Sequence, residues 1–325
     1  MIALISLLLL IGLQASSPVD AKKCPELYRR YSAQHTFCLP ANNTCSILKR
    51  GVTDKDKKLI VKLHNDYRNK VATGQESHAG GMPKAANMLE MIWDDELASV
   101  AQKLAETCNY GHDCNNCRRV KAFSVGQNIG NVNGMGSPIS NADWQQFIKN
   151  LYDEVAVFNK NYIKPYVPGP HAKETQYGHF TQMVWATSWK IGCGWSLFKE
   201  GNTYTSYTVC NYGPAGNMNA GEMYKAGPTC SACPKNSCCG NSCKQKGITA
   251  TYPGLCKVVN PSMPPEGKGP DGGDYTFFCD FNDQPDCAVT FEGKPWTVVK
   301  TPGGNWISKV VNGGEKVALK IQKDF

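Results

Sequence analysis

The sequence predicts an α+β fold in which three helices are followed by an antiparallel sheet. Between residues 54 and 158, apolar residues recur at helical spacing in three segments, and from residue 178 they recur with a period of two. The chain of 325 residues is 41% hydrophobic, so it can bury a core, and it carries 16 cysteines. An even and high cysteine count is typical of secreted proteins that are stabilised by disulfides.

Residues 1–21 are expected to be a secretory signal peptide. An apolar run of about ten residues is followed by Val19-Asp20-Ala21, which fits cleavage after Ala21. The run is too short to span a membrane, and no later stretch is both longer and equally apolar. We therefore expect a secreted, extracellular protein without a transmembrane segment.

Residues 22–53 form an N-terminal lead that carries cysteines. Within it, Cys24 and Cys38 are close enough in sequence to pair, and Asn42 begins a glycosylation sequon. The lead holds three cysteines and residues 54–218 hold five. If all of these pair without using the tail, at least one disulfide must join the lead to the core.

A first helix is expected over residues 54–72. Thr53 with Asp56 forms a variant capping box, and an apolar stripe follows at helical spacing. The stripe consists of Leu59, Ile60, Leu63, Tyr67 and Val71. Three polar residues lie beside the stripe, and anchoring of the helix by hydrogen bonds is their favoured role: His64, Asn65 and Arg68.

Two further helices are expected, one opening at Asp94-Asp95 and one following Asn141. On the third helix, apolar residues from Trp144 to Phe158 share a face. At about 100° per residue, Asp153 falls toward solvent and Glu154 falls on the flank of the apolar face. The period therefore selects Glu154 as the carboxylate that could line a cleft.

The period of two from Gly178 predicts a strand that begins at His179. Two more strands are expected over Lys190–Phe198 and Tyr204–Tyr212, joined by a turn at Gly201-Asn202. A two-residue turn there places Cys193 directly opposite Cys210, at a separation that suits a disulfide.

The remaining chain divides into three parts. Residues 219–258 form a cysteine-rich hinge, whose small size requires disulfides of its own. Residues 259–274 are a linker rich in proline and glycine. Residues 275–325 form a small β-rich segment, in which Cys279 and Cys287 are expected to pair. The Cys-x-x-Cys spacings at 114–117 and 230–233 are interpreted as structural rather than redox-active, because both lie in a secreted, cysteine-rich context.

Four polar residues are candidates for chemistry: His112, Gln127, Glu154 and His179. Two imidazoles and a carboxylate that converge could hold a divalent metal, most plausibly zinc. The alternative is that each histidine is a structural, hydrogen-bonded residue. The sequence contains no nucleophile elbow, zinc-protease motif or phosphate-binding loop. The net charge of +8 comes from scattered basic residues, so nucleic acid is not an expected partner.

At these positions the sequence resembles the CAP superfamily of cysteine-rich secretory proteins, antigen-five venom allergens and plant pathogenesis-related proteins. Four ordered segments resemble its motifs: His64–Arg68, Gly126–Ile129, Gly178–Ser188 and Tyr207–Met218. Residues 24–28 and 108–113 resemble the arthropod antigen-five branch, and residues 228–234 resemble the hinge of cysteine-rich secretory proteins. The resemblance covers residues 54–218, which are expected to be the CAP domain.

The resemblance implies an α-β-α sandwich and a tetrad formed by His112, Gln127, Glu154 and His179. The family's usual first glutamate is Gln127 here, as is typical of antigen-five proteins. A neutral amide lowers the charge available to a cation and cannot act as a base. No cofactor is therefore required, although zinc remains possible on the two histidines and Glu154.

The resemblance implies a secreted, non-enzymatic component of venom or saliva. Its expected partner is an extracellular protein or a small apolar ligand held between helices and sheet. One alternative is a metal-assisted protease that uses His112, Glu154 and His179. Another is an ion-channel or receptor modulator that acts through the cysteine-rich C-terminal region.

Overall fold

A computed structural model describes residues 24–262, apart from 41, 43–44, 137–139 and 171–174, together with residue 265 and the backbone of five short strands farther on. The expected signal peptide and the expected Cys279–Cys287 pair lie outside the described residues. Among the described residues, no helix combines the length and the apolar character that a membrane crossing requires.

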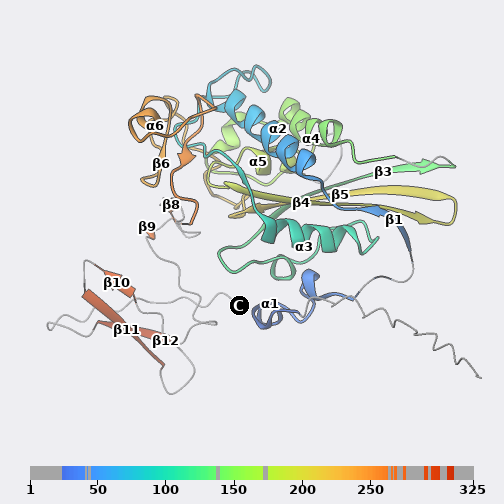
Figure 1. Cartoon of the computed structure of the whole chain (residues 1–325). Coiled ribbons are helices and arrows are strands. Elements are labelled where there is room, and N and C mark those ends of the chain that lie inside the picture. Colours follow the sequence, from blue (N-terminus) through green and yellow to red (C-terminus); the bar gives the residue numbers. More distant parts are fainter. Residues whose placement is uncertain are drawn as a thin grey trace, which may run out of the picture.

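A five-stranded sheet forms the centre of the fold (Figure 1). Its strands are β1 (Ser46–Arg50), β2 (Ile92–Trp93), β3 (Gly126–Met135), β4 (Lys190–Glu200) and β5 (Thr203–Gly213). The order is β1-β4-β5-β3, all antiparallel neighbours, and the short β2 pairs with β4 in parallel. The β4–β5 register matches the one predicted from the turn, with Cys193 opposite Cys210. A disulfide joins these two residues across a Cα separation of 4.1 Å.

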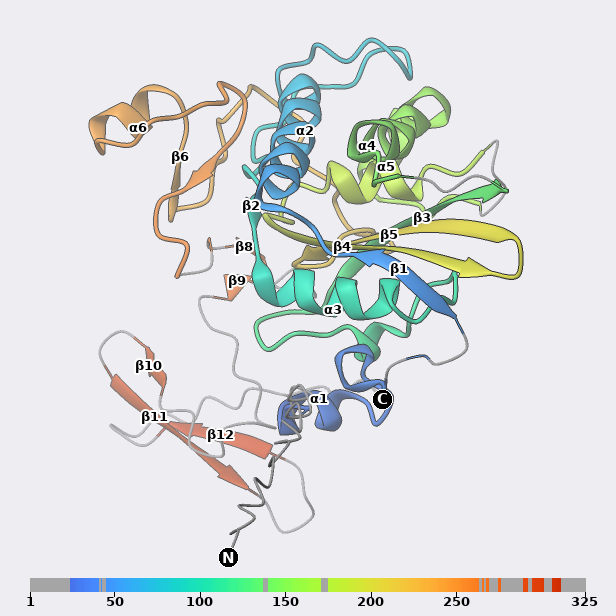
Figure 2. The same ribbon diagram turned by 45° about the vertical axis from the view of Figure 1, so that its right-hand side comes forward.

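Helices cover both faces of this sheet (Figures 1 and 2). The long helices are α2 (Asp54–Ala72), α3 (Asp95–Ala105) and α4 (Trp144–Asp153), and the short ones are α1 (Glu26–Tyr31) and α5 (Gly178–Met183). Helices α2, α4 and α5 lie on one face, while α3 lies on the other. The expected α+β class and α-β-α sandwich are therefore confirmed.

The helix boundaries follow the predicted capping residues. The Thr53 hydroxyl accepts a hydrogen bond from the Asp56 N–H, and the Asp56 carboxylate accepts one from the Thr53 N–H, which completes the capping box of α2. The Asp94 carboxylate accepts the Leu97 N–H at the start of α3. Helix α4 ends at Asp153, earlier than the apolar pattern suggests, and a 3₁₀ turn over Glu154–Val157 continues it.

The predicted strand from Gly178 is wrong, because this segment forms helix α5. Its four residues from Phe180 to Met183 are all buried, so the segment has no polar face from which a period could be read. The polar members are buried with partners: the Thr181 hydroxyl donates to the Asn217 side chain at 2.8 Å, and the Gln182 amide oxygen accepts the Gly216 N–H at 3.0 Å.

His64, Asn65 and Arg68 anchor helix α2 by hydrogen bonds, as the sequence predicts. His64 bonds to the Ile60 carbonyl and to the Tyr212 hydroxyl, and Asn65 exchanges two hydrogen bonds with the Met91 backbone. The buried Arg68 guanidinium donates to five backbone carbonyls, those of Leu89, Met183, Trp185, Ala186 and Ser188. Arg68 thereby ties α2 to the segment that follows α5.

Disulfides connect the outer segments. In the lead, Cys24 is joined to Cys38, and Cys45 is joined to Cys108 of the core. The lead and the core are thus linked, as the cysteine arithmetic requires. The Asn42 side-chain nitrogen donates to the Thr107 carbonyl at 2.5 Å, and glycosylation of Asn42 stays a prediction.

Six cysteines of the hinge pair among themselves, as Cys230–Cys239, Cys233–Cys256 and Cys238–Cys243. They frame the short elements β6 (Ser237–Cys238), α6 (Asn241–Gln245) and β7 (Lys257–Val258). The backbone described beyond them comprises β8 (Gly267–Lys268), β9 (Asp274–Tyr275), β10 (Val289–Phe291), β11 (Lys294–Lys300) and β12 (Trp306–Val310). Strands β10, β11 and β12 form an antiparallel sheet.

Candidate functional site

Glu154 and His179 form one half of the predicted tetrad. Glu154 follows the last residue of α4, and its Oε2 accepts the N–H groups of His179 and Phe180 at 2.9 and 3.1 Å. These N–H groups belong to the first turn of α5 and have no partner within the helix. The other oxygen, Oε1, accepts the His179 Nδ1–H at 2.6 Å. Glu154 therefore caps α5 and orients the imidazole at the same time.

The neighbouring carboxylate, Asp153, has a different environment. Its side chain is 51% exposed and pairs with Lys149, whereas that of Glu154 is 10% exposed. Helix α4 thus directs Glu154, and not Asp153, toward His179.

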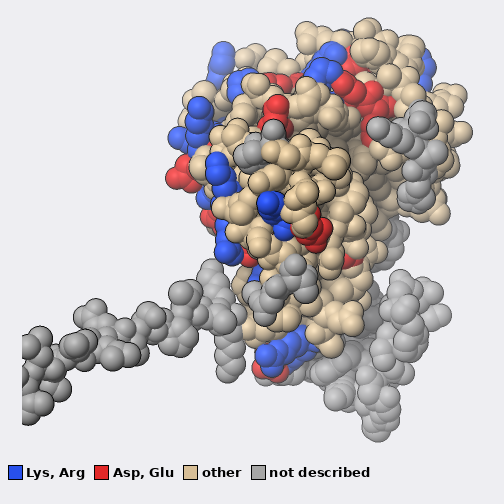
Figure 3. Space-filling model, turned by 90° about the vertical axis from the view of Figure 1, so that its right-hand side faces the viewer, with Lys and Arg blue, Asp and Glu red and all other residues tan. Residues whose placement is uncertain are grey.

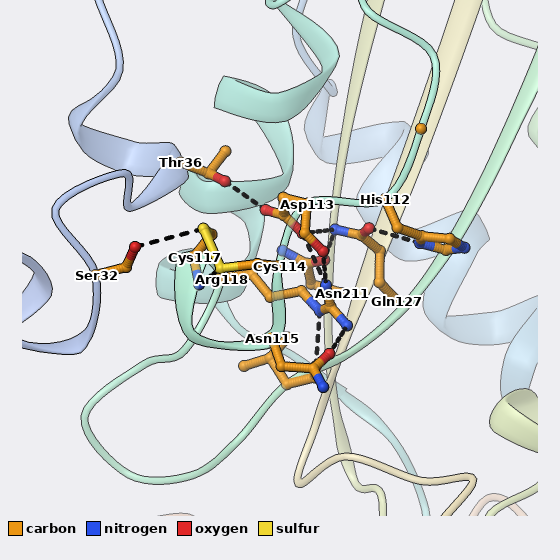
Figure 4. A network of polar contacts seen from close by, with 12 residues as sticks. Ser32, Thr36, His112, Asp113, Cys114, Asn115, Cys117, Arg118, Gln127 and Asn211 are labelled. Atoms are coloured by element: carbon orange, nitrogen blue, oxygen red, sulfur yellow. Dashed lines mark hydrogen bonds and ion pairs between the residues drawn. A yellow bond between two sulfur atoms is a disulfide. The ribbon is translucent and has the colours of Figure 1, made fainter. Parts of the chain in front are cut away.

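His112 and Gln127 form the other half (Figure 4). Gln127 lies on β3, and its Oε1 accepts the His112 Nδ1–H at 2.8 Å. Its Nε2 donates to Oδ1 of Asp113 at 3.1 Å and to Oδ1 of Asn211 at 3.0 Å. The Asn211 amide nitrogen donates to the Leu97 carbonyl, so Oδ1 is the Asn211 atom that accepts the hydrogen bond from Gln127. These contacts fix which way the Gln127 amide faces.

The residue after Gln127 links the two halves. Asn128 donates to the His179 carbonyl at 3.1 Å and to the Tyr212 hydroxyl at 3.2 Å.

Although His112 reaches solvent, desolvation by the surrounding protein lowers the pKa of its ring, and the charges of Arg118 and His179 act in the same direction. His112 is therefore neutral near pH 7.

Both imidazoles use Nδ1 as a donor, which leaves Nε2 of His112 and of His179 as the atoms able to bind a cation. Gln127 and Glu154 are then the outer partners that orient the two rings. The carboxylate of Glu154 is occupied by three N–H donors, so it is not free to serve as a strong third ligand. His112, Glu154 and His179 do not gather as a group of three metal-ligating side chains among the described residues, so a zinc site at the tetrad stays a prediction.

Only one group of three metal-ligating side chains gathers within 4.8 Å in the part of the chain that the structure describes: Cys230, Cys233 and Cys256. All three are consumed by disulfides, so they offer no thiolate to a metal. The hinge is thus a disulfide-stapled element, and the Cys230-x-x-Cys233 pair is not a disulfide of its own.

Within the described ranges, no serine, threonine or cysteine side chain bonds to either tetrad imidazole. Such a pairing is one way in which a nucleophile is activated. Gln127 cannot accept a proton as a general base. What these contacts do show is that Gln127 and Glu154 each orient one imidazole.

Several contributors were missed from the sequence. Asp113, Arg118 and Asn211 complete the environment of Gln127, and Arg118 pairs with Asp113 at 2.9 Å. Asp113 and Arg118 lie outside any periodic segment, and the period of the strand that carries Asn211 does not reveal its partner, so only the position of Asp113 directly after His112 could have indicated a role.

A groove between α2 and α4 was also missed. It is a hollow of about 350 Å³, open to solvent, and it is lined by Tyr67, Lys70, His78, Lys149, Tyr152, Asp153, Val155 and Ala156. Tyr67 and Tyr152 stack at 3.9 Å between ring centroids. Both tyrosines share helical faces with aliphatic side chains, so the helical period predicts core positions for them and does not reveal the groove. We call this feature the α2–α4 groove.

The buried carboxylate of Glu76 contacts two residues that line the groove, Lys70 and Tyr152. It accepts hydrogen bonds from the Tyr152 hydroxyl at 2.6 Å and from the His78 N–H and ring at 2.8 and 2.7 Å. Its Oε2 also forms an ion pair with Nζ of Lys70 at 2.8 Å. Burial alone would raise the pKa of Glu76, but these donors outweigh it and hold the pKa at about 2. Glu76 is therefore ionised, and it fixes Lys70 and Tyr152 in the groove wall.

The charged surface shows no continuous basic face in the view of Figure 3, where acidic and uncharged side chains separate the lysines and arginines.

The sandwich and its pair of oriented imidazoles define a protein of the CAP class. A family model described as the cysteine-rich secretory protein family matches residues 61–212, and the chain belongs to this family. A relative from Trittame loki, named CRISP/Allergen/PR-1, is 47% identical over 303 residues, which cover 93% of this chain and 72% of the relative. Venom allergen 5 of Tityus serrulatus is 43% identical over 93% of this chain and 72% of its own length.

Solved structures agree on the fold. BmVAL-1 is 27% identical with a TM-score of 0.52, and the match covers 63% of this chain and 95% of that chain. The family also includes a structure solved with zinc, NaASP2, which is 29% identical with a TM-score of 0.47 over 62% of this chain and 97% of that chain.

Proposed function

We propose that this chain is a secreted, non-enzymatic binding protein that holds a small apolar ligand in the α2–α4 groove. The observation that carries the proposal is the groove itself, a hollow of about 350 Å³ between two long helices. Its size falls at the lower end of the range for small-molecule sites. Because the groove has the size of a small-molecule site, we propose an apolar ligand, and not an extracellular protein, as the primary partner.

The chemistry of the lining supports an amphipathic occupant. The aromatic faces of Tyr67 and Tyr152, with Val155 and Ala156, offer apolar contact. Lys70, His78, Lys149 and Asp153 contribute the polar side chains of the lining. A site of this kind binds the apolar body of a ligand by burial and orients its polar end by hydrogen bonds.

The groove is held in shape before any ligand arrives. Glu76 bonds to Lys70 and to Tyr152, so both side chains are fixed from the buried side. A lining that is already ordered loses little conformational entropy on binding. Preorganisation therefore supports binding as the role of this site.

Two further observations support the wider proposal. The relatives are venom proteins, and the described cysteines are paired in seven disulfides, a pattern typical of secreted proteins. Gln127 in place of a glutamate and the fully engaged Glu154 leave the tetrad without a carboxylate that is free to act as a base. We therefore assign the tetrad a structural role.

Titration with a fluorescent long-chain fatty acid tests the proposal. Ala156 is exposed and lines the groove, so Ala156→Trp should fill the groove and weaken binding at least ten-fold. Val157 is 48% exposed on the same turn but does not line the groove, so Val157→Trp is the matched control and should bind like the wild type. Equal binding by the two variants, or no binding by the wild type, would contradict the proposal.

A further inference from the structure

We propose that the Cys114–Cys117 disulfide is a site of thiol–disulfide exchange with small extracellular thiols. The two cysteines of this Cys-x-x-Cys segment are bonded to each other, whereas Cys230 and Cys233 of the other such segment are each bonded elsewhere. The structure thus separates two motifs that the sequence presents as alike.

The two sulfurs differ in access. Cys114 is exposed, while Cys117 is 6% exposed and faces the N-terminal lead. The exposure of the two residues therefore favours attack by an incoming thiolate at Cys114 over attack at Cys117. Access to one defined sulfur is a main determinant of exchange rate.

Each sulfur also has a donor that can stabilise negative charge. The Cys117 N–H donates to Sγ of Cys114 at 3.0 Å. The Ser32 hydroxyl lies 3.6 Å from Sγ of Cys117, and a disulfide sulfur carries no hydrogen, so Ser32 is the donor. Figure 4 shows Ser32 reaching toward Cys117 from the lead. The sulfur that must leave in the exchange thus faces a hydroxyl group.

Hydrogen bonds hold the loop in addition to the disulfide. Arg118 donates to Oδ1 of Asp113 at 2.9 Å and to Oδ1 of Asn115 at 2.6 Å, on either side of Cys114. It also donates to the Val125 carbonyl at 2.9 Å. The Thr36 hydroxyl bonds to the same Asp113 carboxylate. These contacts would keep the two thiols close after reduction, so the bond can form again.

The disulfide also contributes little as a staple. Its cysteines are three positions apart, the smallest separation of any disulfide that the structure describes. Closure of a short loop removes the least entropy from the unfolded chain. A structural role therefore explains this bond less well than it explains Cys45–Cys108, which spans 63 positions.

The exchange balances in two steps. A thiolate attacks Sγ of Cys114 and forms a mixed disulfide, while the bond to Cys117 breaks and its electron pair stays on Sγ of Cys117. A second thiolate attacks the sulfur of the first thiol, releases Cys114 as a thiolate and leaves as part of a small disulfide. Two thiols are oxidised, the protein disulfide is reduced, and the two thiol protons end on the two cysteines.

The experiment uses the whole chain in a series of glutathione mixtures of increasing reducing strength, followed by alkylation and peptide mass spectrometry. We expect Cys114 and Cys117 to become alkylated at least ten-fold faster than any other cysteine, with glutathione found on Cys114 as the intermediate. Reduction of this pair no faster than the hinge disulfides, or glutathione on Cys117 instead, would overturn the proposal.

A pair of serine variants tests the role of the leaving sulfur's donor. Ser32→Ala should slow reduction of Cys114–Cys117 several-fold and leave the other disulfides unchanged. Ser242→Ala is the control, because Ser242 bonds to the backbone of Cys239 beside a different disulfide. An equal rate in both variants would remove Ser32 from the mechanism.

Discussion

Nδ1 of His112 donates to Oε1 of Gln127 at 2.8 Å, so an amide stands beside this imidazole where the partner ring of His179 has a carboxylate. The two halves of the tetrad therefore differ in charge while they hold their rings in the same way. This asymmetry determines what the tetrad can bind.

Gln127→Glu should raise zinc affinity about ten-fold or more, because a charged outer partner makes the imidazole a better ligand. The same change should lower stability without zinc, since the new carboxylate would face that of Asp113. Calorimetric titration with zinc checks the affinity. Gln146→Glu on the exposed face of α4 adds the same charge away from the tetrad. An equal gain in both variants would show that the effect is only one of net charge.

The wild-type chain should not cleave peptides, with or without added zinc, because no nucleophile or base accompanies the imidazoles. A panel of quenched fluorescent peptides, assayed with zinc and with chelator, measures this. Cleavage that chelator abolishes and that is lost in His179→Ala would instead support a metal-assisted protease.

The buried Glu76 should make the fold sensitive to acid. Its pKa is lowered to about 2, below the ordinary value of 4.5, so its stabilisation is complete above about pH 5 and is lost as the pH falls toward 2. The difference corresponds to about 3 kcal/mol of unfolding free energy. Urea unfolding at pH 6.5 and pH 3 should show a larger loss for the wild type than for Glu76→Gln. Equal losses in the two proteins would contradict the assignment.

Arg68→Lys should lower the unfolding free energy by about 3 kcal/mol or more, because one ammonium cannot reach the five carbonyls that the guanidinium satisfies. Chemical denaturation gives the value. Arg30→Lys is the matched control, since Arg30 forms a surface pair with Glu26. That exposed pair is worth less than about 1 kcal/mol. A similar small change at Arg68 would mean that its carbonyl partners find other donors.

Local features allowed much of the fold to be predicted. The β4–β5 register depends on a two-residue turn and a period of two, so the position of Cys193 opposite Cys210 could be derived from spacing alone. Helix α2 has a capping box and one apolar stripe, and both are properties of neighbouring residues. The side of α4 on which Glu154 lies follows from the helical period.

Other features depend on contacts between distant segments. Helix α5 buries all residues from Phe180 to Met183, including the polar Thr181 and Gln182, so no polar stripe at helical spacing marked the segment as a helix. The convergence of His112 with Gln127 was expected from family resemblance and not from spacing. The loop around Arg118 has no period, and its shape depends on side chains of the lead, so its two cysteines could not be told apart from those of the hinge.

The occupancy of the α2–α4 groove tests the central claim most directly. The chain would be secreted by insect cells, purified without detergent and extracted with organic solvent, and the extract analysed by mass spectrometry. We predict about one apolar molecule per chain from the wild type and from Val157→Trp, and at least a ten-fold reduction from Ala156→Trp. An extract free of apolar molecules from the wild type, or equal amounts from Ala156→Trp, would contradict the account.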